Sequence, residues 1–325
     1  IVTNIHMDMV GGGPETKAIF HVSKSPQSLP NFANDVAEAF GLFLNKQSDD
    51  YASGSNVDYP IVSSEGGKEA LHAVLGGFHM GSDFQVFAEG SFSIPAIYLH
   101  DWPDRYIHTN YDKPANIDPT KLKRSAFIGA ASAYVLADFD NSYADSFIEF
   151  QKRQVLTRAT SLLSYCELLS PEESENAKCY FWQYEEDAFN SLNTFTTISV
   201  KQTARFQDFM ENLKASIGAG QAVAVNHEKA TTVYSRNKDI KGPMSVFGYN
   251  YFFDHYDASK PTPAIFGYSG IRGSGGAYSY EALNLVNGKR TVLDIRNVLS
   301  AEFGPIPLDI IIEYLEALKS INVIN

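Results

Sequence analysis

Short apolar runs bounded by polar loops recur in the first part of the chain, and this pattern predicts strands. Residues 94–99 form a run rich in Ile, Tyr and Leu, which predicts a buried strand. Residues 1–7 alternate weakly and end at Asp8 before a Gly-rich turn, and residues 18–22 predict another strand. The polar loop after residue 99 therefore lies just past the end of a strand, where ligands bind in α/β sheets.

Helical spacing of apolar residues predicts the helices that connect these strands. A helix beginning at residues 28–30 has one apolar face. That face carries Phe32, Val36, Phe40, Phe43 and Leu44. Residues 65–76 predict a short helix, and Asp118 before Pro119 predicts the N-cap and first residue of a helix that ends near Ala137. The order β–β–α–α–β–loop–α predicts an α/β fold, as half of a three-layer domain.

The pattern changes after residue 137. Residues 147–169 and 179–214 are rich in Glu, Lys, Leu, Phe and Tyr at helical spacing, which predicts a mostly helical region. Residues 218–275 hold more Gly, Pro and aromatic clusters, and the Gly-rich residues 267–276 predict a flexible connector.

Three more helices are predicted near the end of the chain, over residues 278–286, 291–303 and 307–321. This compact three-helix pattern resembles a winged-helix domain. We therefore predict an α/β domain at 1–137, a mostly helical domain with its connector at 138–276, and a winged-helix-like domain at 277–325.

Charge narrows the range of partners. The formal net charge is −12, so the overall field repels nucleic acid and anionic membranes but not a peptide with a free amino group. Residues 277–325 carry four basic and six acidic side chains, whereas a DNA-binding domain needs a basic face. The longest apolar run, residues 126–139, is shorter than the roughly 20 residues of a membrane span.

The start of the chain and its two cysteines leave further questions open. The chain has neither an initiator Met nor a signal peptide, so we expect an N-terminal part to be missing. We expect a soluble protein, and export or a periplasmic location stays open. Cys166 and Cys179 are compatible with a disulfide and equally with two reduced thiols.

Three motif blocks resemble those of one family, the co-catalytic zinc aminopeptidases, which are bacterial and fungal exopeptidases related to glutaminyl cyclases. The first block is NIHMDMVGG at residues 4–12, with Asp8 before Met and Gly. The second is Gly-Ser-Asp-Phe at residues 81–84, followed by Ile-Pro-Ala at 94–96. The third is IHTNYDKPANIDPTKL at residues 107–122. The blocks occur in the order that the family requires and cover roughly residues 1–137.

The resemblance implies a fold, an activity and two metal ligands in this chain. It implies a zinc-exopeptidase α/β domain that removes N-terminal residues from peptides with two zinc ions, which activate a water molecule. Carried over, Asp8 would bind one zinc ion and His108 the other. Asp112 would orient the metal-bound histidine or form a turn. Four further residues are candidates to contact the metal ligands or to line the substrate pocket. They are Asp83, Trp102, Arg105 and Tyr106.

The chain also departs from the family pattern. Phe84 stands where the family has His, and His6 stands where the family has a polar residue before the Asp. The first His, the bridging Asp, the general-base Glu and its neighbouring ligand Glu have no candidate here, so we expect them upstream. Two ligands of five cannot hold two zinc ions tightly, and we expect no catalytic residue and no activity in this chain alone.

Two alternatives remain beside the aminopeptidase. One is a non-catalytic relative that serves as a binding or assembly scaffold, which Phe84 and the missing ligands favour. The other is a glutaminyl-cyclase-like acyltransferase, which the long helical region disfavours. The sequence has no P-loop, no G-x-S-x-G elbow and no His-Glu-x-x-His motif.

Overall fold

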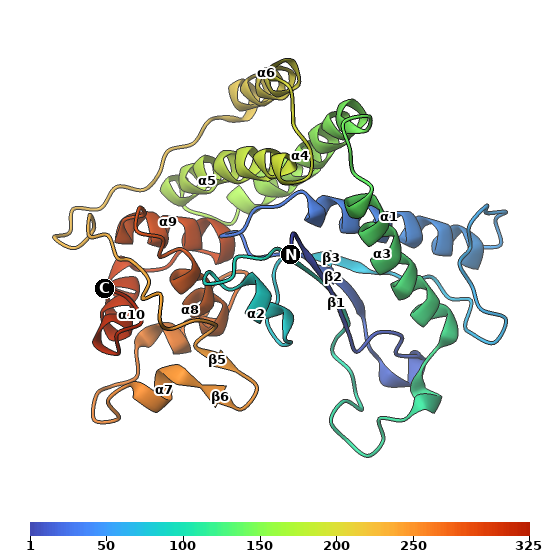
Figure 1. Ribbon diagram of the computed structural model, residues 1–325, viewed down its shortest axis with the longest axis horizontal. Helices are drawn as coiled ribbons and strands as arrows, with labels where there is room; N and C mark the ends of the chain where they lie inside the picture. Colours follow the sequence, from blue (N-terminus) through green and yellow to red (C-terminus); the bar gives the residue numbers. More distant parts are fainter.

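The structure is a computed structural model that describes residues 1–325, and its fold is mixed α/β with one small mixed sheet (Figure 1). The sheet strands are β1 (Asn4–Asp8), β2 (Phe20–Ser23), β3 (Val74–Gly76) and β4 (Ala96–Asp101). Their spatial order is β1-β4-β2-β3. β1 is parallel to β4, β4 is antiparallel to β2, and β2 is parallel to β3. The carboxyl ends of β1 and β4 therefore lie at the same end of the sheet.

Two long helices cover the apolar face of the sheet. They are α1 (Ala33–Ala52) and α3 (Pro119–Ala137). Alternate strand residues point to this face, and a Cβ added at Gly129 of α3 would lie 2.8 Å from Met7 Sδ and 3.6 Å from Leu99 Cδ1. Ile97 and Leu99 are buried here in one core with residues of α1 and α3. The glycine thus lets α3 approach β1 closely.

The opposite face of the sheet is covered by the short helix α2 (Phe84–Ala88). Phe84 is fully buried and stacks on Tyr98 of β4, with ring centroids 4.4 Å apart. Tyr280, from the C-terminal part of the chain, belongs to the same small apolar cluster. Its hydroxyl donates to the carbonyl of Gln85. This face is therefore closed by α2 together with the C-terminal helices.

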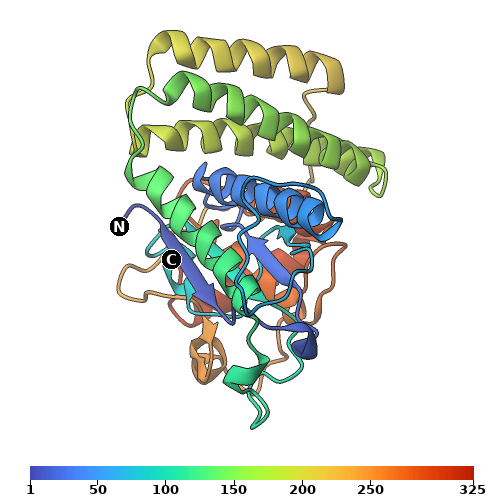
Figure 2. The same cartoon turned by 90° about the vertical axis from the view of Figure 1, so that its right-hand side faces the viewer.

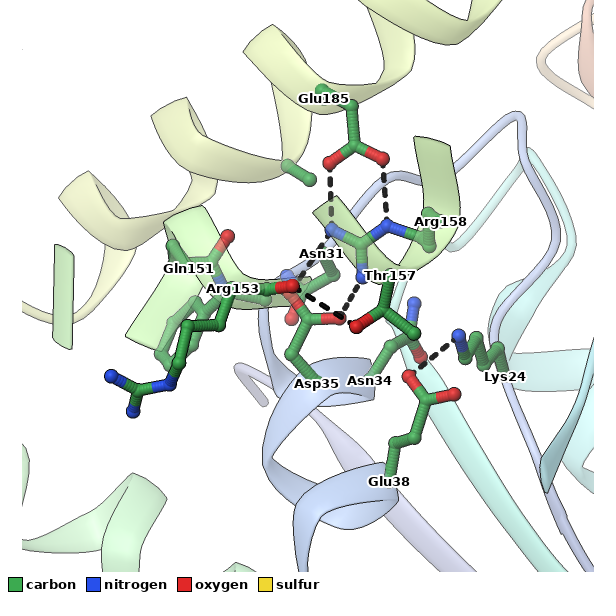
Figure 3. Close-up of polar contacts among 12 residues, drawn as sticks. Lys24, Asn31, Asn34, Asp35, Glu38, Gln151, Arg153, Thr157, Arg158 and Glu185 are labelled. Atoms are coloured by element: carbon green, nitrogen blue, oxygen red, sulfur yellow. Dashed lines mark hydrogen bonds and ion pairs between the residues drawn. The ribbon is translucent and has the colours of Figure 1, made fainter. Parts of the chain in front are cut away.

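Three helices form a layer over α1, as the side view in Figure 2 shows. They are α4 (Ala144–Cys166), α5 (Pro171–Asn190) and α6 (Val200–Ile217). Arg158 of α4 forms ion pairs with Asp35 of α1 and with Glu185 of α5, and Gln151 also donates to Asp35 (Figure 3). This buried network fixes the helical layer on α1. One apolar core runs from the sheet into these three helices.

The C-terminal part forms a second large core. Its helices are α7 (Tyr251–His255), α8 (Gly275–Asn284), α9 (Val292–Phe303) and α10 (Leu308–Ser320), beside the two-stranded β5 (Ser245–Val246) and β6 (Tyr249–Asn250). Four short 3-10 helices lie elsewhere in the chain, at Pro14–Thr16, Pro114–Asn116, Ser191–Thr194 and Ala264–Gly267. The buried residues of this core extend from Ala230 to Ile324. It contacts the sheet region through Ser28, whose N–H and hydroxyl donate to Glu281.

Most predicted elements of the first part are confirmed with shifted ends, and one prediction is wrong. Residues 65–76 form no helix, because Gly66 and Gly67 lie in an irregular loop and Val74–Gly76 pairs with β2 as strand β3. The predicted cap is confirmed, since Asp118 Oδ1 accepts from the N–H of Lys121 at 2.8 Å.

The later part confirms the helical pattern and leaves the domain assignment as a prediction. Residues 278–286, 291–303 and 307–321 correspond to α8, α9 and α10. Both cysteines are free thiols, Cys166 in α4 and Cys179 in α5. None of the helices combines the length and apolarity that a membrane span requires. The winged-helix layout and the boundaries at 137 and 276 stay predictions.

Candidate functional site

Two rows of polar side chains cross the face of the sheet that α2 covers. In the row nearest the carboxyl end of β1, Asp8 is paired with His100 of β4, and His100 is paired with His21 of β2. In the next row, His6 is paired with Tyr98, and Tyr98 with Ser23. Paired residues of neighbouring strands point to the same face, so six polar side chains face α2 and the loop before it.

At the β1 side of this face, Ser82 links His6 to Asp8. The Ser82 hydroxyl donates to Asp8 Oδ2 at 2.6 Å, and His6 Nε2 lies 2.8 Å from Ser82 Oγ. Because the Ser82 hydrogen goes to the carboxylate, the His6 ring donates to Ser82 Oγ. This polarity is the reverse of a Ser-His-Asp triad, in which the imidazole removes the serine proton. Ser82 is therefore a group that orients Asp8, and not a nucleophile.

The surroundings of Asp8 keep its neighbour Tyr98 protonated. Burial and the Asp8 carboxylate together raise the pKa of Tyr98 to about 12. Asp8 itself is half-buried, and its second oxygen, Oδ1, has no hydrogen bond within the protein. Carboxylate oxygens are among the atoms that bind zinc, so Asp8 Oδ1 could serve as a ligand.

Beside Asp8, three imidazoles form the one group of metal-type ligands in the structure. One ligand atom from each of His21, His79 and His100 lies within 4.8 Å of the other two. The rings of His21 and His100 are stacked with centroids 4.9 Å apart, and His79 meets both rings edge-on. Ser23 Oγ lies 3.2 Å from His79 Nδ1 and 3.1 Å from His100 Nε2. The serine therefore orients two of the three rings.

Two of the three imidazoles, those of His79 and His100, are suited to bind a metal because they are held neutral. Burial lowers the pKa of His100 to about 3, and the neighbouring His21 and His79 add to this effect. Burial, and next His21, also lower the pKa of His79. A metal-binding imidazole must be unprotonated on its ligating nitrogen. Proton competition at neutral pH is therefore weak for these two rings.

The loop that follows β4 carries most of the predicted site residues, namely Trp102, Arg105, Tyr106, His108 and Asp112. Asp104 organises it, because its Oδ1 accepts from the N–H groups of Tyr106 and Ile107 at 2.6 and 3.0 Å. The Arg105 guanidinium lies 5.0 Å from the Tyr106 ring centroid. His108 is exposed, has a left-handed backbone with φ of 60°, and its ring makes no hydrogen bond or ion pair. The imidazole of His108 is thus free to bind a ligand.

The predicted site residues are brought together only in part. Trp102 is half exposed, and its carbonyl accepts from His21 Nε2 at 2.9 Å, which connects the loop to the histidine cluster. Asp83 is exposed at the N-cap of α2, next to Ser82. Asp112 is exposed, and its side chain has no partner. No hydrogen bond or ion pair joins His108 to Asp8.

The sequence reasoning missed the three histidines of the cluster. A signal for two of them was present: His21 and Ser23, like Tyr98 and His100, are polar or aromatic at alternate positions of otherwise apolar strands, which indicates a polar sheet face. The sequence did not indicate that β2 and β4 are neighbours, so it could not bring His21 and His100 together. His79 lies in a loop that has no such periodicity.

Comparison of the chain with family models, curated proteins and solved structures finds no match. The basis for assigning a function is therefore the motif resemblance together with the geometry of the site.

Proposed function

We propose that this chain is part of a zinc-dependent aminopeptidase that removes N-terminal residues from peptides, with Asp8 and His108 as zinc ligands. The observation that carries the proposal is the convergence of the three motif blocks. The parallel pairing of β1 with β4 places Asp8 at the end of the sheet from which the His108 loop leaves. The bond from Ser82 to Asp8 brings the second block to the first across 74 residues of sequence.

The free donor atoms fit zinc. Asp8 Oδ1 and the His108 ring are a carboxylate and an imidazole without partners, and zinc binds both types of ligand. Zinc bound there would polarise the scissile carbonyl and lower the pKa of a bound water. Ser82 would hold the Asp8 carboxylate in orientation, as partners of metal ligands commonly do. The acidic net charge favours a substrate with a free ammonium group.

The proposal needs further ligands and a general-base Glu from outside these 325 residues. Two protein ligands from this chain do not hold two zinc ions. The activity is therefore assigned to a protein in which this part is joined to those groups.

The second candidate is a non-catalytic scaffold, and one observation favours it. Phe84, at the position where the resemblance places a His, is fully buried between Tyr98 and Phe78. The position has become part of the apolar core, and no polar ligand can enter there without breaking that packing. A scaffold would keep the fold and bind no zinc at Asp8.

The two candidates differ in zinc content and in hydrolysis of aminoacyl substrates. The protein is expressed from the natural start codon of its gene, and zinc is measured together with release of a chromophore from aminoacyl anilides. We expect about two zinc ions at this site, and both these ions and the activity should be lost in Asp8→Asn and in His108→Gln. His255→Gln, an exposed histidine of α7, is the matched control. A protein that folds, has no activity and keeps the same zinc content in Asp8→Asn and in His108→Gln would support the scaffold.

A further inference from the structure

We propose that His21, His79 and His100 bind one divalent transition-metal ion, of the zinc class, at a site separate from Asp8 and His108. This inference goes beyond the proposed function, because it uses other residues and holds for an enzyme and for a scaffold alike.

The first argument is the pair of buried ring nitrogens that the protein leaves unsatisfied. Nδ1 of His21 and Nδ1 of His100 are both buried and have no hydrogen-bond partner. Buried polar atoms are nearly always paired, so two unpaired nitrogens in stacked neighbouring rings need an explanation. A metal ion bound by both rings would satisfy both nitrogens once the rings turn out of their stacked arrangement so that the two lone pairs converge.

The second argument is the tautomer of His21. Its Nε2 lies 2.9 Å from the Trp102 carbonyl, and a carbonyl can only accept, so when the ring carries a single hydrogen this hydrogen is on Nε2. The lone pair is therefore on Nδ1, the buried and unpaired atom. A backbone carbonyl that fixes the tautomer in this way is the usual partner of a metal-binding histidine.

The third argument is access and ligand type. His100 is only 3% exposed, whereas His79 is exposed in the loop that follows β3. An ion can therefore enter from the His79 side while the buried ring forms the floor. Three imidazoles without a carboxylate or a thiolate in the group suit zinc, copper or nickel, and not magnesium or calcium.

A fourth coordination position has no protein ligand in this group. A three-histidine zinc site with an open position has the composition of a catalytic zinc site, where water occupies the fourth place. We therefore expect the ion to keep at least one exchangeable ligand.

The test is a titration with Co²⁺, which gives visible absorption when it replaces zinc. It is carried out in the Asp8→Asn, His108→Gln variant, so that the other proposed site is removed. We expect one equivalent of Co²⁺ to bind, and we expect the ¹⁵N resonances of the three rings to shift. Adding His79→Gln should weaken binding by at least about tenfold, and circular dichroism should show an unchanged fold because His79 is exposed.

His255→Gln in the same background is the matched control and should bind Co²⁺ like its parent. Absence of binding in the background variant would overturn the inference while leaving the aminopeptidase proposal intact. Binding that His79→Gln does not weaken would overturn it as well. Conversely, Co²⁺ bound by the histidines of the background variant, together with a lack of peptidase activity in the parent protein expressed from its natural start codon, would support this site and count against the proposed function.

Discussion

Asp8 and His100 are register partners in the parallel pair of β1 and β4, with both side chains on the face of the sheet that α2 covers. Adjacent strands lie about 4.8 Å apart, so the proposed zinc ligand and the histidine cluster are neighbours on one surface. The rest of that surface is polar as well, with His6 and Ser23 in the next row. Asp8 and the polar side chains around it therefore lie together on one face of one small sheet.

The Ser82 hydroxyl should be a positioning group for Asp8. In Ser82→Ala, the carboxylate loses its 2.6 Å hydrogen bond, and we expect zinc affinity at Asp8 to fall by about 10–100-fold. Zinc dissociation constants from chelator competition measure the change. Ser161→Ala, an exposed serine of α4, should leave the affinity unchanged. An unchanged affinity in Ser82→Ala would show that this bond has no part in metal binding.

The buried network at Arg158 should stabilise the helical layer strongly. Arg158→Met leaves the Asp35 and Glu185 carboxylates buried without their cation (Figure 3), so we expect a loss of about 3–5 kcal/mol in the free energy of unfolding. Arg205→Met removes ion pairs with Asp145 and Glu149, which are largely exposed, and should cost about 0–1 kcal/mol. Urea unfolding compares the two, and equal losses would contradict the importance of burial here.

The buried carboxyls of Glu281 and Glu302 should make stability fall as pH rises. Burial raises the pKa of both groups, and Glu281 raises that of Glu302 further. No Lys or Arg forms an ion pair with either carboxyl, and the Ser28 N–H and hydroxyl bind Glu281. A carboxyl whose pKa is higher in the folded state stabilises the protein below its unfolded pKa, and that contribution is lost as pH rises through the folded pKa.

Glu302→Gln replaces one of these two carboxyls with an amide that does not titrate. We expect this variant to be more stable than the parent at about pH 8 and to lose less stability between about pH 5 and pH 8. The urea midpoint at both pH values measures the effect. Glu313→Gln, on α10, is the control, and a parent that showed no greater pH dependence than Glu302→Gln would contradict the prediction.

Asp118 should contribute more than an ordinary helix cap. Its Oδ1 accepts from Lys121 N–H, and its Oδ2 accepts from Gly67 N–H at 2.7 Å, which ties the loop before β3 to α3. Asp118→Ala removes both bonds and should cost about 2 kcal/mol or more. Asp118→Asn keeps one acceptor oxygen and should cost less. Thermal unfolding compares the two variants with the parent, and an Asp118→Asn variant that keeps the cap and is as stable as the parent would show that the bond to Gly67 contributes nothing.

The sequence predicted elements well where the signal is local. The start of α3 was predicted because Asp118 and Pro119 are a specific pair of N-terminal signals, and the last three helices because their apolar spacing is regular. The prediction failed at residues 65–76, where an apolar run of three residues forms β3 only because β2 is beside it. Short strands of this kind depend on their neighbours, and these neighbours are not visible in local sequence.

The residues of the candidate site also divide into those that local sequence predicts and those that only the fold brings together. Asp8 and the loop containing His108 were found from sequence because strand-end and motif patterns are local. The histidine cluster depends on the antiparallel register of β2 against β4, which pairs His21 with His100 across 79 residues of sequence. The role of Ser82 also required the fold, because nothing in the sequence shows that its hydroxyl points to Asp8.

The most direct measurement is anomalous diffraction at the zinc edge, on crystals of the protein expressed from the natural start of its gene. The account predicts one zinc ion about 2.0–2.2 Å from an oxygen of Asp8 and a second zinc ion, beside the first, bound to His108. Zinc in the crystal with no anomalous peak at Asp8 or at His108 would contradict the proposed aminopeptidase.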